Sequence, residues 1–463
     1  MRDPLWTSED IVKATGGRLA VRAFAAGGVT FDSREVRPGD LFVALAGERD
    51  GHAYAAAAFA AGAAGVLASR PVEGPHVLVP DTLRALEAMG AFARDRSLAL
   101  RAAVTGSVGK TSVTQAVAAG LARAGRWHSS VKSYNNHIGV PLTLARMPWE
   151  TQRAVFEIGM NHEGEIAPLS RMVRPDVAVI TTVGPVHIEN FADGEAGVAR
   201  AKAEIFDGVE QGAVAVLNAD NPWFDLLART ARAAGATVRS FGSGPEADAR
   251  LLDFSTAHGH ASVKATVCGA PVSFPLLQTG LHWGLNSLCV LLTLEAMDVD
   301  RETALTALAE FAPLAGRGAE KTVRIDGGAF TLIDESYNAN PISMAAALRT
   351  LGARQERGRR IVALTDMLEL GPEAPAFHAG LAGPIEAAAV DFVFCAGPMM
   401  KSLWDALPPT RRGGYADSAA ELAPRIAAAV QPGDLVMVKG SNGSRASTIA
   451  AALAALDRGG ETA

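Results

Sequence analysis

Cysteine is scarce in this sequence of 463 residues: Cys268, Cys289 and Cys395 are the only three, and no two of them stand in a C-x-x-C spacing. Three isolated cysteines exclude a disulfide-stapled secreted domain and a cysteine zinc site, and they are typical of reduced thiols in a cytosolic protein. The first residues, "MRDPLWTSEDIVKATGG", also lack the apolar core of a signal peptide. We therefore expect a cytoplasmic protein.

An excess of positive charge is also missing, because the formal net charge is −6 at pH 7. This balance argues against a nucleic-acid partner or an anionic lipid surface. The longest uncharged run, residues 53–69, is slightly short of the roughly 20 apolar residues of a membrane span and consists mostly of alanine and glycine. We predict that it forms a helix, a glycine turn and a short strand, and we expect no membrane span. No obvious interaction helix suggests more than a monomer.

Apolar, strand-like runs alternate with helical stretches over nearly the whole chain, which is typical of an α/β protein. A prior of roughly 150 residues per domain suggests about three domains, which we place at residues 1–99, 100–318 and 319–463. The central one shows a patch, "HASVKATVCGAPVSFPLL", that predicts an antiparallel excursion. In the last one, strands ending in Asp334, Asp366 and Lys439 predict a Rossmann-like parallel sheet with ligand contacts along one edge.

The stretch "AAVTGSVGKTSVTQAV" places glycines between a predicted strand and a predicted helix, as a phosphate-binding loop requires. Gly106 and Gly109 would let backbone N–H groups face phosphates, Lys110 would reach terminal phosphate oxygens, and the Thr111 hydroxyl would bind Mg²⁺. The standard pattern has a glycine where Val104 stands, so a glycine turn with an exposed lysine is the alternative. The context favours nucleotide binding by Gly106, Ser107, Val108, Gly109, Lys110, Thr111 and Ser112.

Other polar residues follow the next strands. Glu157 ends the run "AVFEIG" and is a candidate Mg²⁺ carboxylate, while His187 follows the next strand at the same edge. Each could equally be a solvated or structural group. The helical pattern around Lys202 predicts a surface lysine.

Two further groups have open interpretations. Asn135, Asn136 and His137 precede a glycine and a proline, where they could cap backbone groups or bind a polar substrate. In "VKGSNGSR", Lys439 and Ser441 could form an anion site or a mere turn, and in "TDMLELG" Asp366 and Glu369 could shape a substrate site.

Taken together, these segments resemble the Mur ligases of peptidoglycan synthesis, in the right order over nearly the whole chain. The opening segment "FDSREVRPGDLFVALAGERDGHAY" is similar to the family's uridine-binding domain, and the family has its own loop of the form "TGSVGKT". The motif "DESYNANP" points to the branch that adds D-alanyl-D-alanine to a UDP-N-acetylmuramoyl tripeptide. The other segments that carry the resemblance are "NNHIGVPLTL", "EIGMNHEGEI", "GVARAKAEIF", "TDMLELG" and "VKGSNGSR".

The resemblance implies a metal site. Thr111 and Glu157 match magnesium-binding positions, and His187 matches a residue near a second metal. Lys202 matches a lysine that family members carry as a carbamate, which would offer Mg²⁺ an oxygen ligand where an ammonium group would repel it. With Lys110 and Arg317, His187 and Lys202 make up the expected catalytic set.

The resemblance also implies nucleotide and substrate contacts. Asn286 matches an adenine contact, Arg317 an arginine that bridges to the phosphates, and Asp334 a ribose contact. Tyr337 and Asn338 are expected close to the nucleotide. Ser33 and Arg34 are expected near the uridine diphosphate, with Asn135, Asn136 and His137 as further candidate substrate contacts. Taken singly, each could be a cap, a linker charge or a strand end, whereas the ordered set favours the functional interpretation.

The implied reaction is ATP-dependent amide-bond formation through an acyl phosphate, with the domains closing around the substrates. Three alternatives remain at this point. The chain could be a sister ligase adding a different amino acid, a P-loop NTPase without ligase activity, or a non-catalytic UDP-sugar-binding protein.

Overall fold

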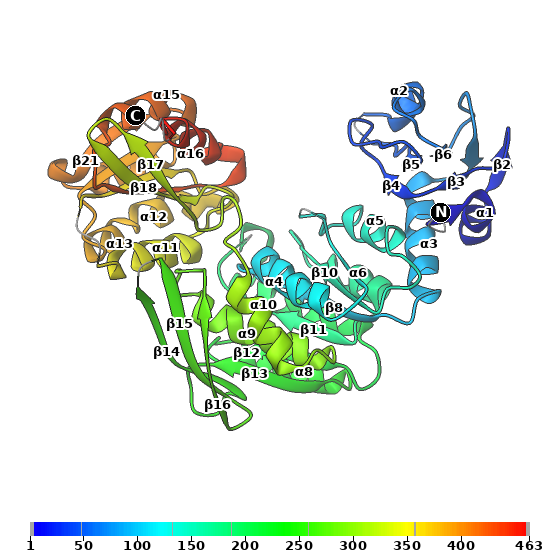
Figure 1. Cartoon of the computed structure of the whole chain (residues 1–463), viewed down its shortest axis with the longest axis horizontal. Helices are drawn as coiled ribbons and strands as arrows, with labels where there is room; N and C mark the ends of the chain where they lie inside the picture. Colours follow the sequence, from blue (N-terminus) through cyan, green and yellow to red (C-terminus); the bar gives the residue numbers. More distant parts are fainter. Residues whose placement is uncertain are drawn as a thin grey trace.

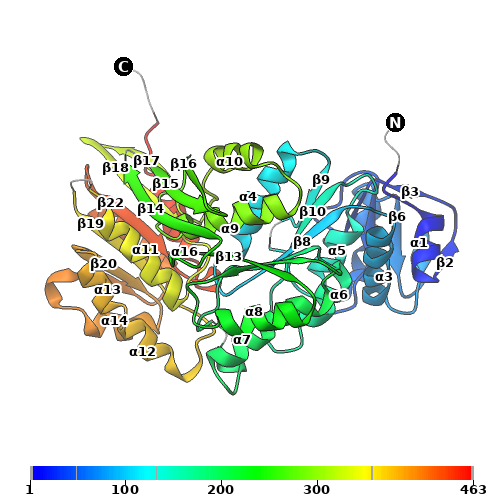
Figure 2. The ribbon, with the colours of Figure 1, turned by 90° about the horizontal axis from the view of Figure 1, so that it is seen from below.

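Three large sheets follow one another along the chain in the computed structural model, which describes residues 4–47, 49–131, 133–186, 188–257, 259–355 and 358–459. The large sheets lie within residues 18–78, 100–276 and 319–439, and a further two-stranded sheet pairs residues 6–7 with 25–26. Figures 1 and 2 show the first and third units at opposite ends of the molecule with the second between them. The predicted three-domain α/β fold is confirmed.

The N-terminal unit has a five-stranded sheet of order β2-β7-β6-β5-β4, parallel except for β2. The uncharged run at residues 53–69 forms a helix, a turn and a strand, as predicted. The elements are β1 (Trp6–Thr7), α1 (Ser8–Thr15), β2 (Arg18–Ala20), β3 (Ala25–Ala26), β4 (Gly28–Thr30), β5 (Asp40–Val43), the 3₁₀ helix η1 (Gly51–Tyr54), α2 (Ala55–Ala60), β6 (Gly65–Ala68), β7 (His76–Leu78) and α3 (Thr82–Asp95).

The central unit has a nine-stranded sheet of order β16-β15-β14-β13-β12-β11-β8-β10-β9. Its strands from β8 to β13 run parallel, and the predicted antiparallel excursion is confirmed as β14–β15–β16. The strands are β8 (Leu100–Thr105), β9 (Trp127–Ser129), β10 (Arg153–Glu157), β11 (Val177–Ile180), β12 (Val214–Asn218), β13 (Thr237–Gly242), β14 (Ala249–Ala257), β15 (His260–Val267) and β16 (Ala270–Leu276).

Helices cover both faces of this sheet, which is why its inner strands are apolar without alternation. In Figure 2, α4, α9 and α10 lie on one side of the sheet and α6, α7 and α8 on the other, matching the two buried clusters of the unit. The helices are α4 (Lys110–Arg123), α5 (Gly139–Ala145), α6 (Ile166–Val173), α7 (Glu195–Ala203), α8 (Phe224–Ala233), α9 (Trp283–Ala296), α10 (Arg301–Glu310) and the 3₁₀ helices η2 (Ile188–Asn190) and η3 (Glu204–Gly208).

The N-terminal unit shares a hydrophobic core with α5 of the central unit. Leu142 and Ala145 of α5 pack in the same buried cluster as the first unit's strands and α3. The Trp6 indole N–H donates to the Ala145 carbonyl at 2.7 Å, and the Arg146 guanidinium donates to the Val29 carbonyl at 2.6 Å. The two units are therefore joined by buried apolar area as well as by hydrogen bonds.

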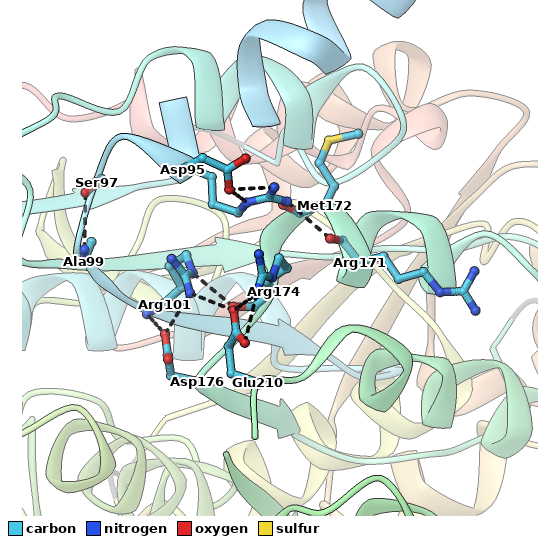
Figure 3. Close-up of polar contacts among 10 residues, drawn as sticks. Asp95, Ser97, Ala99, Arg101, Arg171, Met172, Arg174, Asp176 and Glu210 are labelled. Carbon is cyan, nitrogen blue, oxygen red and sulfur yellow. Dashed lines mark hydrogen bonds and ion pairs between the residues drawn. The ribbon is translucent and has the colours of Figure 1, made fainter. Parts of the chain in front are cut away.

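A network of charged side chains links the amino ends of neighbouring strands in the central sheet (Figure 3). The Arg101 backbone N–H donates to the Asp176 carboxylate at 2.7 Å, and its side chain donates to the Arg174 carbonyl at 3.0 Å. Glu210 pairs with both arginines. This network lies at the amino ends of β8, β11 and β12, so the opposite edge is left for ligands.

The C-terminal unit has a six-stranded sheet of order β17-β18-β22-β19-β20-β21, parallel except for β17. Helices cover both faces, as expected for a Rossmann-like unit. The elements are β17 (Ala319–Ile325), β18 (Gly328–Glu335), α11 (Pro341–Ala353), β19 (Arg360–Thr365), η4 (Gly371–Glu373), α12 (Ala374–Ala379), α13 (Ala382–Ala387), β20 (Phe392–Ala396), α14 (Met400–Ala406), η5 (Pro409–Arg411), β21 (Arg412–Ala416), α15 (Ala419–Ala429), β22 (Leu435–Lys439), η6 (Asn442–Ser444) and α16 (Ala446–Ala454).

Within the described part of the chain, no helix combines the length and the apolar character needed to span a membrane.

His128 on β9 predicts an acid-sensitive step in stability. Burial lowers its pKa from 6.5 to about 4, although the hydrogen bond from its Nε2 to the Thr143 carbonyl opposes this shift. Below pH 6.5 the unfolded imidazole binds a proton that the folded one refuses until about pH 4, so the free energy of unfolding falls with pH across this window. Urea unfolding at about pH 7 and about pH 5 should show His128→Gln losing about 2 kcal/mol less than the wild type. His260→Gln, at an exposed histidine, serves as the control, and equal losses in His128→Gln and wild type would contradict the assignment.

Candidate active site

A cleft of about 730 Å³ lies between the central and C-terminal units. The carboxyl ends of β8, β10, β11 and β12 face it from one side, and those of β18 and β22 face it from the other. Ligands of open α/β sheets bind at such ends. The lining includes Ser107–Ser112, Ser133, Asn135, Glu157, Thr181, Asn286, Arg317, Tyr337, Asn338, Lys439 and Ser441.

The loop between β8 and α4 has the shape that a phosphate needs. A side chain at Gly106 would place its Cβ 1.9 Å from the Thr181 hydroxyl oxygen, so only glycine fits there. Gly109 has φ +87° and precedes the first residue of α4. The Thr181 hydroxyl donates to the Val108 carbonyl at 2.5 Å and fixes the loop between these glycines. The amino end of α4 therefore opens into the cleft, where its dipole favours an anion.

Three charged groups converge on this loop. The Lys110 ammonium donates to the Gly106 carbonyl at 2.7 Å. Burial lowers the pKa of Lys110, the negative charge of Glu157 opposes that shift, and the positive charge of Arg317 adds to it. The two cations lie close enough to influence each other, and a polyanion is the ligand that would relieve their repulsion.

Glu157 carries an unsatisfied oxygen at the cleft. Its side chain is 1% exposed, and its Oε1 accepts a hydrogen bond of 2.8 Å from the Asn135 amide. Its Oε2 is buried and has no hydrogen-bond partner among the residues that the structure describes. The Thr111 hydroxyl also lines the cleft. A buried carboxylate oxygen without a partner is costly unless a cation occupies the space beside it.

No cluster of three or more His, Cys, Asp and Glu side chains suited to a metal ion occurs in the described part of the chain. A divalent ion beside Glu157 would therefore draw its remaining ligands from hydroxyl groups, water and bound substrate. Mg²⁺ is commonly bound in this way, through one or two carboxylates and substrate phosphates. The donor set present fits Mg²⁺. His187 lies outside the described residues, and its proposed metal contact stays a prediction.

Lys202 is buried, and the prediction of a surface lysine is wrong. It lies near the end of α7, is 3% exposed, and makes no side-chain hydrogen bond or ion pair with any residue that the structure describes. Burial lowers the pKa of Lys202 well below 10.5, and the charge of Lys110 lowers it further. The helical pattern failed here because α7 packs against the core with small residues, so its faces differ little in polarity.

Most of the residues predicted to contact the nucleotide outside the phosphate loop line the cleft, and Asp334 does not. Asn286 lies beside Gly109, because a Cβ added to that glycine would stand 3.5 Å from the Asn286 amide nitrogen, and Asn338 lines the cleft. The Arg317 guanidinium carbon stands 4.1 Å from the centre of the Tyr337 ring. Asp334 instead holds the linker between the units, accepting hydrogen bonds from the Gly316 N–H and the Ser336 hydroxyl. Its ribose contact stays a prediction.

The substrate candidates around α5 divide into different roles. Asn135 lines the cleft and holds Glu157. Asn136 holds the turn before α5, its Oδ1 accepting hydrogen bonds from the N–H groups of Ile138 and Gly139. His137 is exposed.

Ser33 and Arg34 follow β4 in the N-terminal unit. The Arg34 guanidinium is largely exposed and pairs with the Asp32 carboxylate at 2.6 Å. Both residues lie at the carboxyl end of a parallel strand, the usual place for a ligand contact.

The loop after β19 borders the cleft through Leu368, Glu369 and Leu370. Asp366 itself is buried, which raises its pKa, and accepts a hydrogen bond from the Met400 N–H. Asp366 therefore supports this loop from the protein interior and does not line the cleft.

Sequence reasoning missed three residues at the cleft. Ser133 contacts Tyr337, and Glu335 accepts a hydrogen bond of 3.1 Å from the Lys439 ammonium. His282 lines the cleft, where desolvation by the surrounding protein lowers its pKa and the charge of Glu335 opposes this. Of the three, only His282 could have been predicted from the sequence, because it lies one helical turn before the candidate adenine contact Asn286.

Three family models match the chain. They are the Mur ligase family catalytic domain over residues 26–97, the Mur ligase middle domain over residues 104–294, and the Mur ligase glutamate ligase domain over residues 321–442.

Curated relatives and solved structures agree with these matches. The UDP-N-acetylmuramoyl-tripeptide–D-alanyl-D-alanine ligase of Rickettsia prowazekii is 31% identical, over 95% of this chain and 97% of the relative. The same ligase of Escherichia coli is 35% identical, over 84% and 86%. A crystal structure of MurF from Acinetobacter baumannii superposes with a TM-score of 0.85 at 26% identity, covering 97% of this chain and 99% of that one.

Proposed function

Because the chain belongs to the Mur ligase family, we propose that it joins D-alanyl-D-alanine to UDP-N-acetylmuramoyl-tripeptide at the expense of ATP. The product is the UDP-muramoyl-pentapeptide precursor of peptidoglycan, made in the cytoplasm by a monomeric enzyme. The observation that supports a phosphate-driven reaction is the convergence of Lys110, Arg317 and the unpaired Glu157 oxygen on one cleft.

The reaction needs activation because a carboxylate resists attack by an amine. Transfer of the γ-phosphoryl group of ATP to the tripeptide carboxylate gives an acyl phosphate, and the dipeptide amine then displaces phosphate. Lys110, Arg317 and the N–H groups at the start of α4 provide fixed positive charge where the phosphate charge changes. Closure of the units around the bound substrates would keep water away from the activated carbonyl.

The Mg²⁺ site is proposed at Glu157 and Thr111, with Lys202 as a carbamate. When bound, Mg²⁺ would neutralise charge on the phosphate oxygens. Glu157 contributes its free Oε2, and Thr111 contributes a hydroxyl group at the first turn of α4. A buried ammonium group without a partner is unfavourable at Lys202, whereas a carbamate there is a second carboxylate-like ligand.

The two remaining substrates are assigned to the two ends of the molecule. We place the uridine diphosphate in the N-terminal unit near Ser33 and Arg34. We place the dipeptide against the C-terminal unit, at the loop Leu368–Leu370 that borders the cleft.

The test is ADP release measured with UDP-N-acetylmuramoyl-tripeptide and D-alanyl-D-alanine, together and singly. We expect rapid release only when both are present, and formation of the pentapeptide product in equal amount. ADP release that ignores either substrate would identify a nucleotide hydrolase instead. Turnover with a different amino acid in place of the dipeptide would identify a sister ligase.

A further inference from the structure

Tyr337 contacts both sides of the cleft. It follows β18 in the C-terminal unit, and its hydroxyl shares a hydrogen bond of 2.5 Å with the hydroxyl of Ser133 in the central unit, 204 residues away. Its ring carries the Arg317 guanidinium at 4.1 Å from the ring centre. One side chain thus joins the two units and holds a cation of the site.

The linker between the units is shaped around Tyr337. The Tyr337 backbone N–H donates to the Gly316 carbonyl at 3.0 Å, and the Gly316 N–H donates to the Asp334 carboxylate at 3.1 Å. Gly316 has φ +72°, and a Cβ there would lie 2.9 Å from the Tyr337 Cβ. These backbone contacts place the next residue, Arg317, beside the Tyr337 ring.

On the central unit, the contact of Tyr337 with Ser133 connects to Glu157, the proposed metal-binding carboxylate. Ser133 lies two residues before Asn135, whose amide donates to Glu157 Oε1 at 2.8 Å. The Asn135 carbonyl also accepts a hydrogen bond of 2.8 Å from the Gly159 N–H, just beyond Glu157. The segment Ser133–Asn135 is thus the bridge between the Tyr337 hydroxyl and Glu157.

We propose that Tyr337 is a positioning residue that holds Arg317 and Glu157 in alignment with each other across the cleft. This inference rests on the proposed function. The ring holds the arginine toward the phosphate loop, and the hydroxyl holds the segment that orients the carboxylate. If Tyr337 acted only by contacting the nucleotide, its hydrogen bond to Ser133 would not matter for the reaction, and changes at Ser133 would leave kcat unchanged.

The experiment compares Tyr337→Phe, Ser133→Ala and the double variant, with Tyr54→Phe and Ser255→Ala as matched exposed controls. Each single variant loses the same bond, so we expect each to lower kcat about 3–10-fold and the double to equal either single. Ser133→Thr keeps a hydroxyl group and should retain most of the wild-type kcat. Tyr337→Leu, which also loses the stacking on Arg317, should lower kcat about 30–100-fold.

The KM for UDP-N-acetylmuramoyl-tripeptide should stay within about twofold in these variants, since the N-terminal unit is untouched. Thermal melting confirms that each variant is folded. Additive losses in the double variant, or a Ser133→Ala enzyme with wild-type kcat, would overturn the inference while the wild-type ligase activity stands. Absence of substrate-dependent ADP release in the wild type would instead overturn the proposed function.

Discussion

Lys110→Ala is expected to lower kcat for ADP release about 10²–10³-fold, because it removes a fixed positive charge at the transferring phosphate. The ammonium group is already held in the loop, donating to the Gly106 carbonyl at 2.7 Å. Steady-state kinetics with both substrates measure the loss, and nucleotide binding should weaken in parallel.

The control for this change is Lys264→Ala, at an exposed lysine on β15 far along the sheet from the loop. It should leave kcat unchanged. A Lys110→Ala enzyme within about tenfold of wild-type kcat would exclude the Lys110 ammonium group from a role in phosphate transfer.

Lys202→Ala is expected to lower kcat at least about 10²-fold and to respond to small carboxylates. The substitution removes a lysine that lies close enough to Lys110 for that charge to lower its pKa, and it leaves a buried space, since Lys202 is 3% exposed. Formate or acetate can enter that space and supply the oxygens of the missing carbamate. Partial recovery of ADP release with formate is therefore expected.

Lys202→Arg is the matched variant for this test, because its guanidinium fills the space and cannot form a carbamate. It should be inactive and should not recover with formate, and the wild type should be indifferent to formate. Wild-type protein in ¹³C-bicarbonate should show a carbamate carbon signal by NMR that Lys202→Ala lacks. A full-activity Lys202→Ala enzyme would remove Lys202 from the site.

Local sequence signals were sufficient for the most apolar strands and for the phosphate loop. Runs such as Val177–Ile180 are apolar without alternation because helices cover both faces of the sheet, and this indicated a parallel α/β unit. The loop at Gly106–Thr111 could be recognised because its glycines stand between a strand and a helix. The antiparallel patch followed from its density of β-branched residues.

What the sequence could not show depends on packing and on contacts between distant segments. Edge strand β17 is largely exposed and β21 begins "RGG", so neither has the apolar pattern of a strand. Lys202 was predicted at the surface because charge alone carries no information about what packs over it. The contact between Ser133 and Tyr337 joins residues 204 positions apart, beyond the reach of any local pattern.

The two joints of the molecule differ in stiffness. The first unit and α5 share one buried cluster, whereas the buried clusters of the C-terminal unit contain, among the described residues, none from the central one. Across the second joint, contacts such as those of Thr279 with Glu320 and of Leu281 with Thr350 are single hydrogen bonds. If the proposed substrate placement holds, the shared buried cluster fixes the distance between the N-terminal unit and the phosphate loop. We expect the C-terminal unit, which is joined to the central unit by few buried contacts, to be the unit that moves during the reaction.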